Sequence, residues 1–210
     1  MGVIIKKYVD NDCLLGVWEI TEDYDTLLST VNLDEADMAL LKSFGNHKRK
    51  LEWLSVRNLV VEMVAPGTKI VYNRDRKPFL MGNSFNISIS HSNNLTSILL
   101  SKNKRVGIDL EFMSHKISRL EFKFINQQEY ITDDEDLKKY HLYIHWCAKE
   151  AMYKICDKQE INFRENLTVS PFEPAKEGVT TGELKNRIRH EKFKLHYFEI
   201  DNYVVVWCNK

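Results

Sequence analysis

The chain has 210 residues, of which 43% are hydrophobic and 29% are charged, and its 30 basic and 30 acidic side chains cancel. This composition is typical of a globular protein with one large domain or two smaller halves. Zero net charge excludes a global field that attracts nucleic acid or a membrane surface, so any anion site is local. The sequence shows neither a signal peptide nor an apolar run of membrane-spanning length. We therefore expect a cytoplasmic protein that binds neither nucleic acid nor a membrane.

The N-terminal half is expected to combine helices with short strands. Alternating apolar residues predict strands, and apolar residues at three- and four-residue spacing predict helices. These patterns place strands at 14–20, 70–72, 85–90, 95–101 and 106–112, and helices at 34–44 and 47–64. The last three strands are separated by short turns and are predicted to form a three-strand meander, with His91 at one of its turns.

The helix at 47–64 begins with a cluster of basic residues. His47, Lys48, Arg49 and Lys50 lie in its first turn, where positive charge opposes the helix dipole. Charge runs of this kind are usually solvated surface. An anionic ligand nearby would stabilise this end of the helix, so the cluster is also a candidate binding site.

The strand at 106–112 carries two carboxylates on one face. Its residues alternate, so Asp109 and Glu111 point to the same side about 7 Å apart, at about 3.3 Å of rise per residue. Like charges in this position repel each other unless a cation lies between or above them. Gly107, on the same face, leaves room for a ligand or another backbone to approach. The pattern alone also fits an ordinary half-buried strand with a solvated acidic face.

The C-terminal half is expected to combine one long helix with a sheet. The pattern predicts helices over 120–130, with a break at Asn126, and over 138–156. In the longer helix Glu150 and Lys154 share a face and make a favourable i, i+4 pair. Strands are predicted at 167–169, 178–184, 193–200 and 203–207. Both halves thus run through helices and antiparallel strands, which favours an α+β fold of two similar halves.

Two stretches, 106–111 and 146–154, together resemble the signature motifs of the 4′-phosphopantetheinyl transferases. The first reads Val-Gly-Ile-Asp-Leu-Glu and is similar to the Gly-Ile-Asp-x-Glu strand of that family. The second reads Trp-Cys-Ala-Lys-Glu-Ala-Met-Tyr-Lys and is similar to Trp-(Ser/Cys/Thr)-x-Lys-Glu-(Ala/Ser)-x-x-Lys. Each motif is weak by itself, but the ordered pair at this separation is specific.

Shorter segments extend the resemblance over about residues 48–154. Residues 76–80, Arg-Lys-Pro-Phe-Leu, resemble the Gly-Lys-Pro-aromatic turn of the family, and 89–92 resemble its Ile-Ser-His-Ser segment. The stretch 122–130 is similar to Phe-Phe-Ser-x-x-Glu and brings Glu129 as a further candidate carboxylate.

The chain also departs from the family pattern at positions outside the carboxylates. Arg76 and Asn93 stand where the family usually has glycine, and Ser88 stands where it usually has asparagine. The length and the presence of an N-terminal half indicate the monomeric, surfactin-synthetase-activating branch, since the short trimeric acyl-carrier-protein synthases lack such a half.

The resemblance implies transfer of 4′-phosphopantetheine from coenzyme A to a serine of an apo carrier protein, with release of 3′,5′-ADP. Asp109, Glu111 and Glu150 would supply the hard oxygen ligands that Mg²⁺ or Mn²⁺ prefers. Lys154 would reach the pyrophosphate and stabilise or protonate the leaving group. Glu150, or a metal-bound water that it orients, would take the proton of the carrier serine.

The resemblance also assigns the coenzyme A contacts. Lys48 or Arg49, together with Lys77, Ser90 and His91, would hold the phosphate groups of the coenzyme. These residues lie in the first half of the chain, whereas the carboxylates lie in the second.

That division predicts a pseudo-duplicated architecture with halves 1–102 and 103–210 and the active site in the cleft between them, so that a monomer suffices. Two other functions stay open. One is a non-catalytic module that binds carrier proteins, and the other is a different magnesium-dependent enzyme acting on a nucleotide diphosphate. The motifs do not indicate whether the carrier belongs to fatty-acid, polyketide or peptide synthesis.

Overall fold

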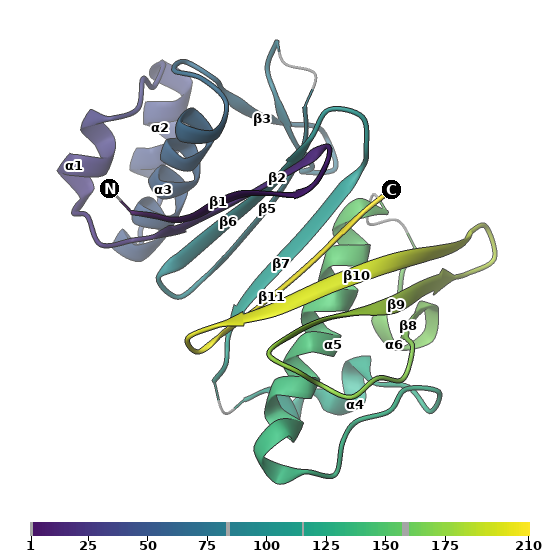
Figure 1. The fold of residues 1–210 in the computed structure, drawn as a ribbon. Helices are drawn as coiled ribbons and strands as arrows, with labels where there is room; N and C mark the ends of the chain where they lie inside the picture. Colours follow the sequence, from purple (N-terminus) through teal and green to yellow (C-terminus); the bar gives the residue numbers. More distant parts are fainter. Residues whose placement is uncertain (1, 83–84, 115, 157–159) are drawn as a thin grey trace. The chain divides into compact units, whose positions relative to one another are not determined.

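Two larger antiparallel sheets, each packed against a long helix, and one small two-stranded sheet organise the described part of the chain in a computed structural model (Figure 1). It describes residues 2–82, 85–114, 116–156 and 160–210. The chain divides into the units Met1–Asn103 and Lys104–Lys210. The predicted α+β class with antiparallel sheets is confirmed, whereas the duplication of similar halves stays a prediction. Within the described ranges no helix is long and apolar enough to cross a membrane.

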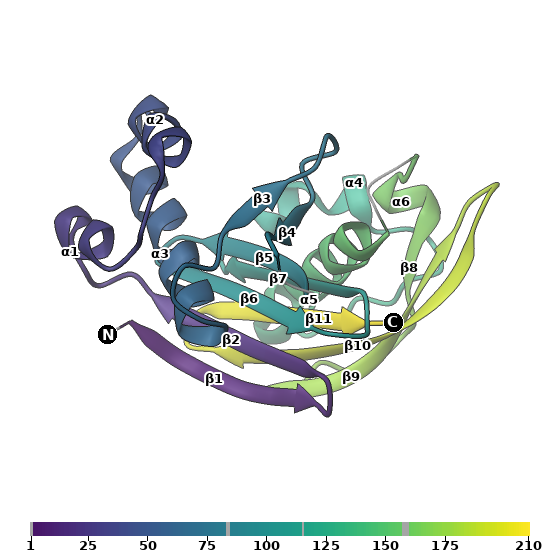
Figure 2. The same cartoon turned by 90° about the horizontal axis from the view of Figure 1, so that it is seen from above.

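The N-terminal unit contains a sheet of strands in the order β1-β2-β6-β5, a separate β3-β4 hairpin and helices α1 to α3. Long helix α3 packs on β2 and β6 (Figure 2). The bounds of these elements are β1 (Val3–Asp10), β2 (Cys13–Glu19), α1 (Tyr24–Ser29), α2 (Glu35–Ser43), α3 (His47–Met63), β3 (Ile70–Tyr72), β4 (Pro78–Leu80), β5 (Asn86–Ser92) and β6 (Leu95–Ser101).

Helix α3 starts where the sequence predicts and has the expected basic first turn. The side chain of Asn46 caps it by accepting a hydrogen bond from the backbone N–H of Lys48 at 2.9 Å. The cap satisfies one of the backbone donors that a helix start leaves open. Trp53 and Leu59 are buried further along and fix the helix to the core of its unit.

The C-terminal unit contains a sheet in the order β7-β11-β10-β9-β8, with α5 packed on β7 and β11 (Figure 1). The bounds of its elements are β7 (Val106–Phe112), η1 (Ile117–Arg119), α4 (Glu121–Phe124), α5 (Glu135–Ile155), α6 (Phe163–Asn166), β8 (Leu167–Val169), β9 (Glu177–Lys185), β10 (His190–Ile200) and β11 (Tyr203–Asn209). A hairpin turn at 201–202 joins β10 and β11, and Asp201 adopts a positive φ of 50° there.

Helix α5 is the longest helix of the unit and lies close to the sheet. Asp134 caps it, because its carboxylate accepts hydrogen bonds from the backbone N–H groups of Asp136 and Leu137 at 2.9 and 3.3 Å. Ala148 and Ala151 are fully buried in the last turns. Their small side chains let the helix backbone approach the strands, which matters for the site below.

The predicted three-strand meander is wrong in its third strand: β5 and β6 pair as expected, but β7 lies in another sheet. Strand β6 has β2 on one side and β5 on the other, so no place is left beside it for β7. Strand β7 pairs instead with β11 from the far end of the chain, with Asp109 opposite Val206. Local spacing suggested the meander, but long-range pairing decided the topology. His91 also lies within β5, paired with Thr96, and not at a turn.

Strand β7 is more buried than a half-exposed strand. Each residue from Val106 to Leu110 is buried, including Asp109 at 3% exposure, and only Glu111 and Phe112 keep partial exposure. Helix α5 covers the face that carries Gly107. The alternative of a solvated acidic face is therefore wrong at Asp109.

Several elements were not predicted from the sequence. Strand β1 and helices α1 and α6 fall in segments without clear periodicity. The predicted helix over 120–130 is present only as the single turn α4 after η1. Beyond it the chain runs as a loop, in which Asn126 and Glu129 bind other segments through their side chains.

Candidate active site

The close contact between β7 and α5 occurs at Gly107. A Cβ atom at this position would overlap the carbonyl oxygen of Ala151 and would lie 3.0 Å from its carbonyl carbon and 3.3 Å from Cβ of Ile155. Only glycine allows this approach. Gly107 was predicted to leave room for a ligand or another backbone, and in the structure the backbone of α5 takes this room. The approach brings the first motif, on β7, against the second motif, on α5.

An ion pair joins the two motifs at the same place. Nζ of Lys154 donates to Oδ1 of Asp109 at 2.7 Å and to the backbone carbonyl of Ile108 at 2.9 Å. The Lys154 side chain keeps 21% exposure, whereas that of Asp109 keeps 5%. The lysine is thus the more exposed partner of the pair, and its ammonium group is bound to the more deeply buried carboxylate.

The other two predicted metal ligands lie on the same two elements as this pair. Glu111 follows Asp109 by two residues, on the same face of β7, and Glu150 directly precedes Ala151 on α5; both are partly exposed. Their donors, together with Asp109, are carboxylate oxygens, which suit Mg²⁺ better than a soft metal. Among the residues described, no three His, Cys, Asp or Glu side chains gather closely enough to hold a metal. Metal ligation by these carboxylates therefore stays a prediction.

The basic residues assigned to coenzyme A lie together in the N-terminal unit. Arg49, in the first turn of α3, places Nη1 at 2.6 Å from Nε2 of His91 on β5. Glu52 accepts from Arg49 at 3.3 Å and lies 3.5 Å from Nδ1 of His91. Lys48 donates to the side-chain oxygen of Asn93 at 3.1 Å. The structure thus brings Lys48, Arg49 and His91 to the basic start of α3.

The remaining two predicted contacts sit in different settings. Ser90 lies within β5 and is 7% exposed. Lys77 lies in the turn before β4, where its backbone N–H donates to the side chain of Asn73 at 2.8 Å.

The residues that replace the glycines of the family, Arg76 and Asn93, both have positive φ, of 60° and 51°. Glycine adopts this conformation without strain, which explains the usual residue at both positions.

Lys149 belongs to the second motif, but no role was predicted for it from the sequence. Its ammonium group donates to Oε2 of Glu129 at 2.7 Å, to the carbonyl of Phe163 at 3.1 Å and to the carbonyl of Phe124. Both side chains of the ion pair are fully enclosed, at 0% exposure. Burial lowers the pKa of Lys149, and Glu129 opposes that shift. Glu129 is thus engaged with Lys149, which gives it a structural contact outside the predicted metal ligands.

The sequence contains a pattern that indicates the buried position of Lys149, although no prediction was made from it. His141, His145 and Lys149 repeat at four-residue spacing, which predicts a polar row along one side of α5, and all three are fully buried. Burial lowers the pKa of His141 to about 4 and that of His145 to about 3. Glu173 acts in the opposite direction on the pKa of His141. Both histidines are therefore neutral at neutral pH.

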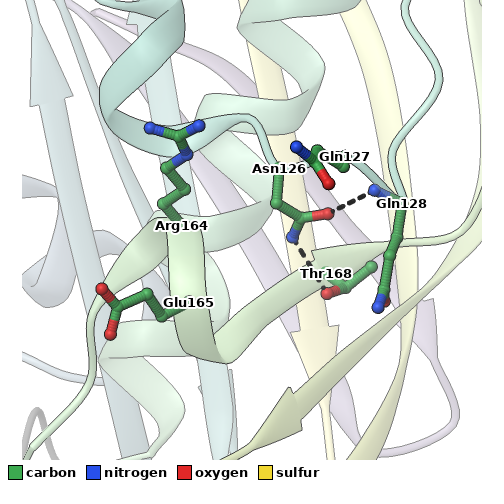
Figure 3. Close-up of a pocket in the computed structure, with 6 residues that line it drawn as sticks. All are labelled: Asn126, Gln127, Gln128, Arg164, Glu165 and Thr168. Carbon is green, nitrogen blue, oxygen red and sulfur yellow. Dashed lines mark hydrogen bonds between the residues drawn. The ribbon is translucent and has the colours of Figure 1, made fainter.

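A surface pocket of about 400 Å³ lies beside β8 (Figure 3). Its lining consists of polar residues: Asn126, Gln127, Gln128, Arg164, Glu165 and Thr168. The amide of Asn126 donates to Oγ1 of Thr168 at 3.1 Å and to the carbonyl of Leu167 at 3.3 Å. None of the predicted site residues lines this pocket, so it is separate from the place where the motifs meet.

Comparisons with known proteins agree with the motifs. Residues 105–208 match the 4′-phosphopantetheinyl transferase superfamily. The match continues through β8 to β11, so the resemblance reaches further toward the C-terminus than residue 154.

Two curated relatives carry names from the same superfamily. The chain is 31% identical over 85 residues to the 4′-phosphopantetheinyl transferase AcpT of Salmonella typhi, covering 40% of this chain and 44% of that protein. It is 28% identical over 170 residues to the 4′-phosphopantetheinyl transferase HetI of a Nostoc species, covering 71% and 70% of the two chains. The chain thus spans less than half of AcpT and somewhat over two thirds of HetI. The region 105–208, in which the two motifs are in contact, thus belongs to the 4′-phosphopantetheinyl transferase superfamily.

Proposed function

We propose that this protein transfers the 4′-phosphopantetheine group of coenzyme A to a serine of an apo carrier protein and releases 3′,5′-ADP. The observation that carries the proposal is the meeting of the two motifs. Gly107 admits the backbone of α5 onto β7, and Lys154 pairs with Asp109 at 2.7 Å. A carboxylate-rich strand joined to a Glu–Lys helix is suited to phosphate chemistry, which needs charge neutralisation and a proton acceptor.

We propose roles for the residues of the C-terminal unit as follows. Asp109, Glu111 and Glu150 would hold Mg²⁺ or Mn²⁺, which when bound supplies positive charge to the pyrophosphate of coenzyme A. The serine oxygen forms a bond to the phosphorus next to the pantetheine, and the bond from that phosphorus to the bridging oxygen breaks. Glu150 would take the serine proton, and Lys154 would stabilise the negative charge left on 3′,5′-ADP.

We propose that the basic start of α3 and its neighbours bind the phosphate groups of coenzyme A. Arg49 and His91 already approach each other at 2.6 Å and present two nitrogen-bearing groups at one position. Charge-assisted hydrogen bonds from such groups are the usual means of holding phosphates. Lys48, Lys77 and Ser90 would add further donors. We also propose, from the resemblance, a cytoplasmic monomer of the surfactin-synthetase-activating type.

Mass spectrometry of apo carrier proteins tests the proposal. Acyl and peptidyl carriers are incubated with this protein, coenzyme A and Mg²⁺, and the intact mass of each carrier is followed. The proposal predicts that at least one carrier gains the mass of phosphopantetheine on its serine, and that omission of coenzyme A prevents the gain. A carrier that binds without any gain in mass would support the binding-module alternative. Turnover of a nucleotide diphosphate other than coenzyme A would support the third alternative.

A further inference from the structure

The Lys149–Glu129 ion pair is enclosed, and each N–H donor of the lysine ammonium group makes a hydrogen bond. A lysine ammonium group has three donors. In this structure they meet Oε2 of Glu129 and the backbone carbonyls of Phe124 and Phe163. With 0% exposure of both side chains, neither residue touches a substrate. Any effect of the pair on the reaction must therefore pass through the residues that it holds.

Glu129 extends the connection to two further segments. Its Oε2 accepts a hydrogen bond from the backbone N–H of Asn126 at 2.9 Å, and its Oε1 accepts one from the backbone N–H of Val169 at 2.8 Å. The loop after α4, the start of α6 and strand β8 are thus tied to one turn of α5 through Lys149. A buried charged network of this kind has one well-defined arrangement, because any other leaves a charge without a partner.

The last turns of α5 are held on two sides. A helix rotates about 100° per residue, so Lys149 and Ala151 point to nearly opposite sides of it. On one side Lys149 binds the loop segments, and on the other Ala151 lies against Gly107. Lys154, one turn later, is bound to Asp109. Glu150 lies between these fixed points, so the rotation of its Cα–Cβ direction about the helix axis is set by them.

We propose that Lys149 and Glu129 form a positioning pair that sets the rotation of α5 and thereby the placement of Glu150 against Asp109. This inference rests on the proposed function, in which Glu150 acts directly on the reaction. A merely stabilising pair would be replaceable by any neutral pair that keeps the protein folded. A positioning pair would not, because small displacements of a reacting group lower the rate strongly.

The test uses a double variant, Lys149→Met with Glu129→Gln, because a single change would leave one charge buried without a partner. The double variant removes both charges while keeping similar shapes, and the introduced glutamine keeps an oxygen acceptor for one of the two backbone N–H groups that Glu129 binds through separate oxygens. The matched control is Glu191→Gln, which removes the ion pairs of Glu191 with Arg105 at 2.9 Å and Lys210 at 2.7 Å. Circular dichroism and thermal unfolding establish that each variant is folded.

Two measurements decide the matter. The proposal predicts that the folded double variant loses about 10- to 100-fold in kcat, while KM for coenzyme A stays within about twofold, and that the control keeps both values. It also predicts faster amide hydrogen exchange in residues 147–155 and 121–131 of the double variant than in the control. An unchanged kcat in the folded double variant overturns the proposal, and so does a parallel loss in kcat and in overall stability with uniform exchange.

The exchange measurement separates this proposal from the proposed function. If the wild-type protein modifies no carrier, the assigned reaction fails, but hydrogen exchange still reports on the pair. Faster exchange confined to the two segments then supports control of α5 by Lys149 and Glu129. Unchanged exchange in both segments overturns it whatever the activity.

Discussion

Two lysines on helix α5, five residues apart, each form an ion pair of 2.7 Å with a carboxylate, yet their surroundings differ completely. The Lys149–Glu129 pair has no exposed surface and is surrounded by backbone carbonyl and N–H groups. The Lys154–Asp109 pair keeps a partly exposed lysine, at 21%, and lies on the two elements that also carry Glu150 and Glu111. A lysine–carboxylate ion pair thus occurs once in the enclosed interior and once at an accessible site.

The difference shows that two ion pairs of equal length can have different roles when one is buried and the other is partly exposed. Breaking a buried pair leaves a charge without water or partner, which is strongly unfavourable. An accessible lysine loses less, because water takes the place of its partner. Lys149 therefore suits a fixed role, whereas Lys154 can exchange its contact with Asp109 for one with a phosphate group. The predictions that follow test this division in order of expected effect.

The largest effect is expected when the carboxylates of the accessible site are neutralised. Asp109→Asn and Glu150→Gln should each lower turnover by about 100- to 1000-fold, because charge stabilisation of the pyrophosphate is lost. Chelation with EDTA should abolish activity, and added Mg²⁺ should restore it. Carrier modification followed by mass spectrometry measures both, with Glu191→Gln as the control. Full activity in Asp109→Asn or in metal-free buffer would contradict the assignment.

The two ion pairs should differ sharply in their effect on stability. Lys149→Met is expected to lower the free energy of unfolding by about 3–5 kcal/mol, because Glu129 then remains buried and charged without its partner. Asp109→Asn is expected to lower it by about 1 kcal/mol, because the Lys154 that is left behind keeps 21% exposure and water can take the place of its partner. Urea unfolding followed by circular dichroism compares the variants. Equal losses would show that burial does not separate the two pairs.

The enclosed side of α5 should also make the protein sensitive to acid. The pKa of His141 is about 4 in the folded protein, well below the value of an unfolded histidine, which is about 6.5. The unfolded state therefore binds more protons between these values, and stability falls as pH decreases from about 6.5 toward about 4. The loss from His141 alone is on the order of 3 kcal/mol, and His145, whose pKa is lowered further, adds to it.

A variant that keeps the hydrogen bond of His141 checks the source of this acid sensitivity. Nδ1 of His141 accepts from the backbone N–H of Thr132 at 3.2 Å, and the side-chain oxygen of asparagine can take that place. The variant His141→Asn should show a shallower fall of the urea midpoint between pH about 6.5 and 4. An unchanged pH profile would mean that other groups cause the loss.

The smallest effect is expected at a strained surface position in the other unit. Arg76 has a φ of 60°, a conformation that disfavours side chains with a Cβ atom. Arg76→Gly should therefore raise the free energy of unfolding by about 0.5–1 kcal/mol, because relief of strain outweighs the added freedom of the unfolded chain. Asn93→Gly should give less, since asparagine tolerates this conformation and Asn93 binds Lys48. Thermal unfolding of both variants measures these small changes in stability, which can then be compared with the larger losses expected at the two ion pairs.

The sequence was most informative where local pattern and chemistry coincide. The strand at 106–112 and the long helix that follows were predicted from periodicity, and Gly107 was expected to admit another backbone. The structure confirms these features through β7, α5 and the contact at Ala151. The resemblance between motifs then pointed to the superfamily that the comparisons show.

The failures share a physical reason, which is that long-range pairing does not follow from local spacing. The meander failed because β6 pairs with β2 and β7 pairs with β11, from distant parts of the chain. Glu129 was read as a candidate member of the carboxylate group, yet it is enclosed with Lys149 because the loop after α4 folds back onto α5. Only the polar row ending at Lys149 offered a hint, since three polar residues on one helix side match either a solvated face or a buried network.

The most direct test of the role of Lys154 in the accessible site is the rate at which an apo carrier gains phosphopantetheine with wild-type protein, Lys154→Met and Glu191→Gln. Intact-mass spectrometry follows each reaction at saturating coenzyme A and Mg²⁺, after circular dichroism has shown that all three proteins are folded. The account predicts conversion by wild type and Glu191→Gln and none by Lys154→Met within the same time. Conversion by Lys154→Met at the wild-type rate would contradict it.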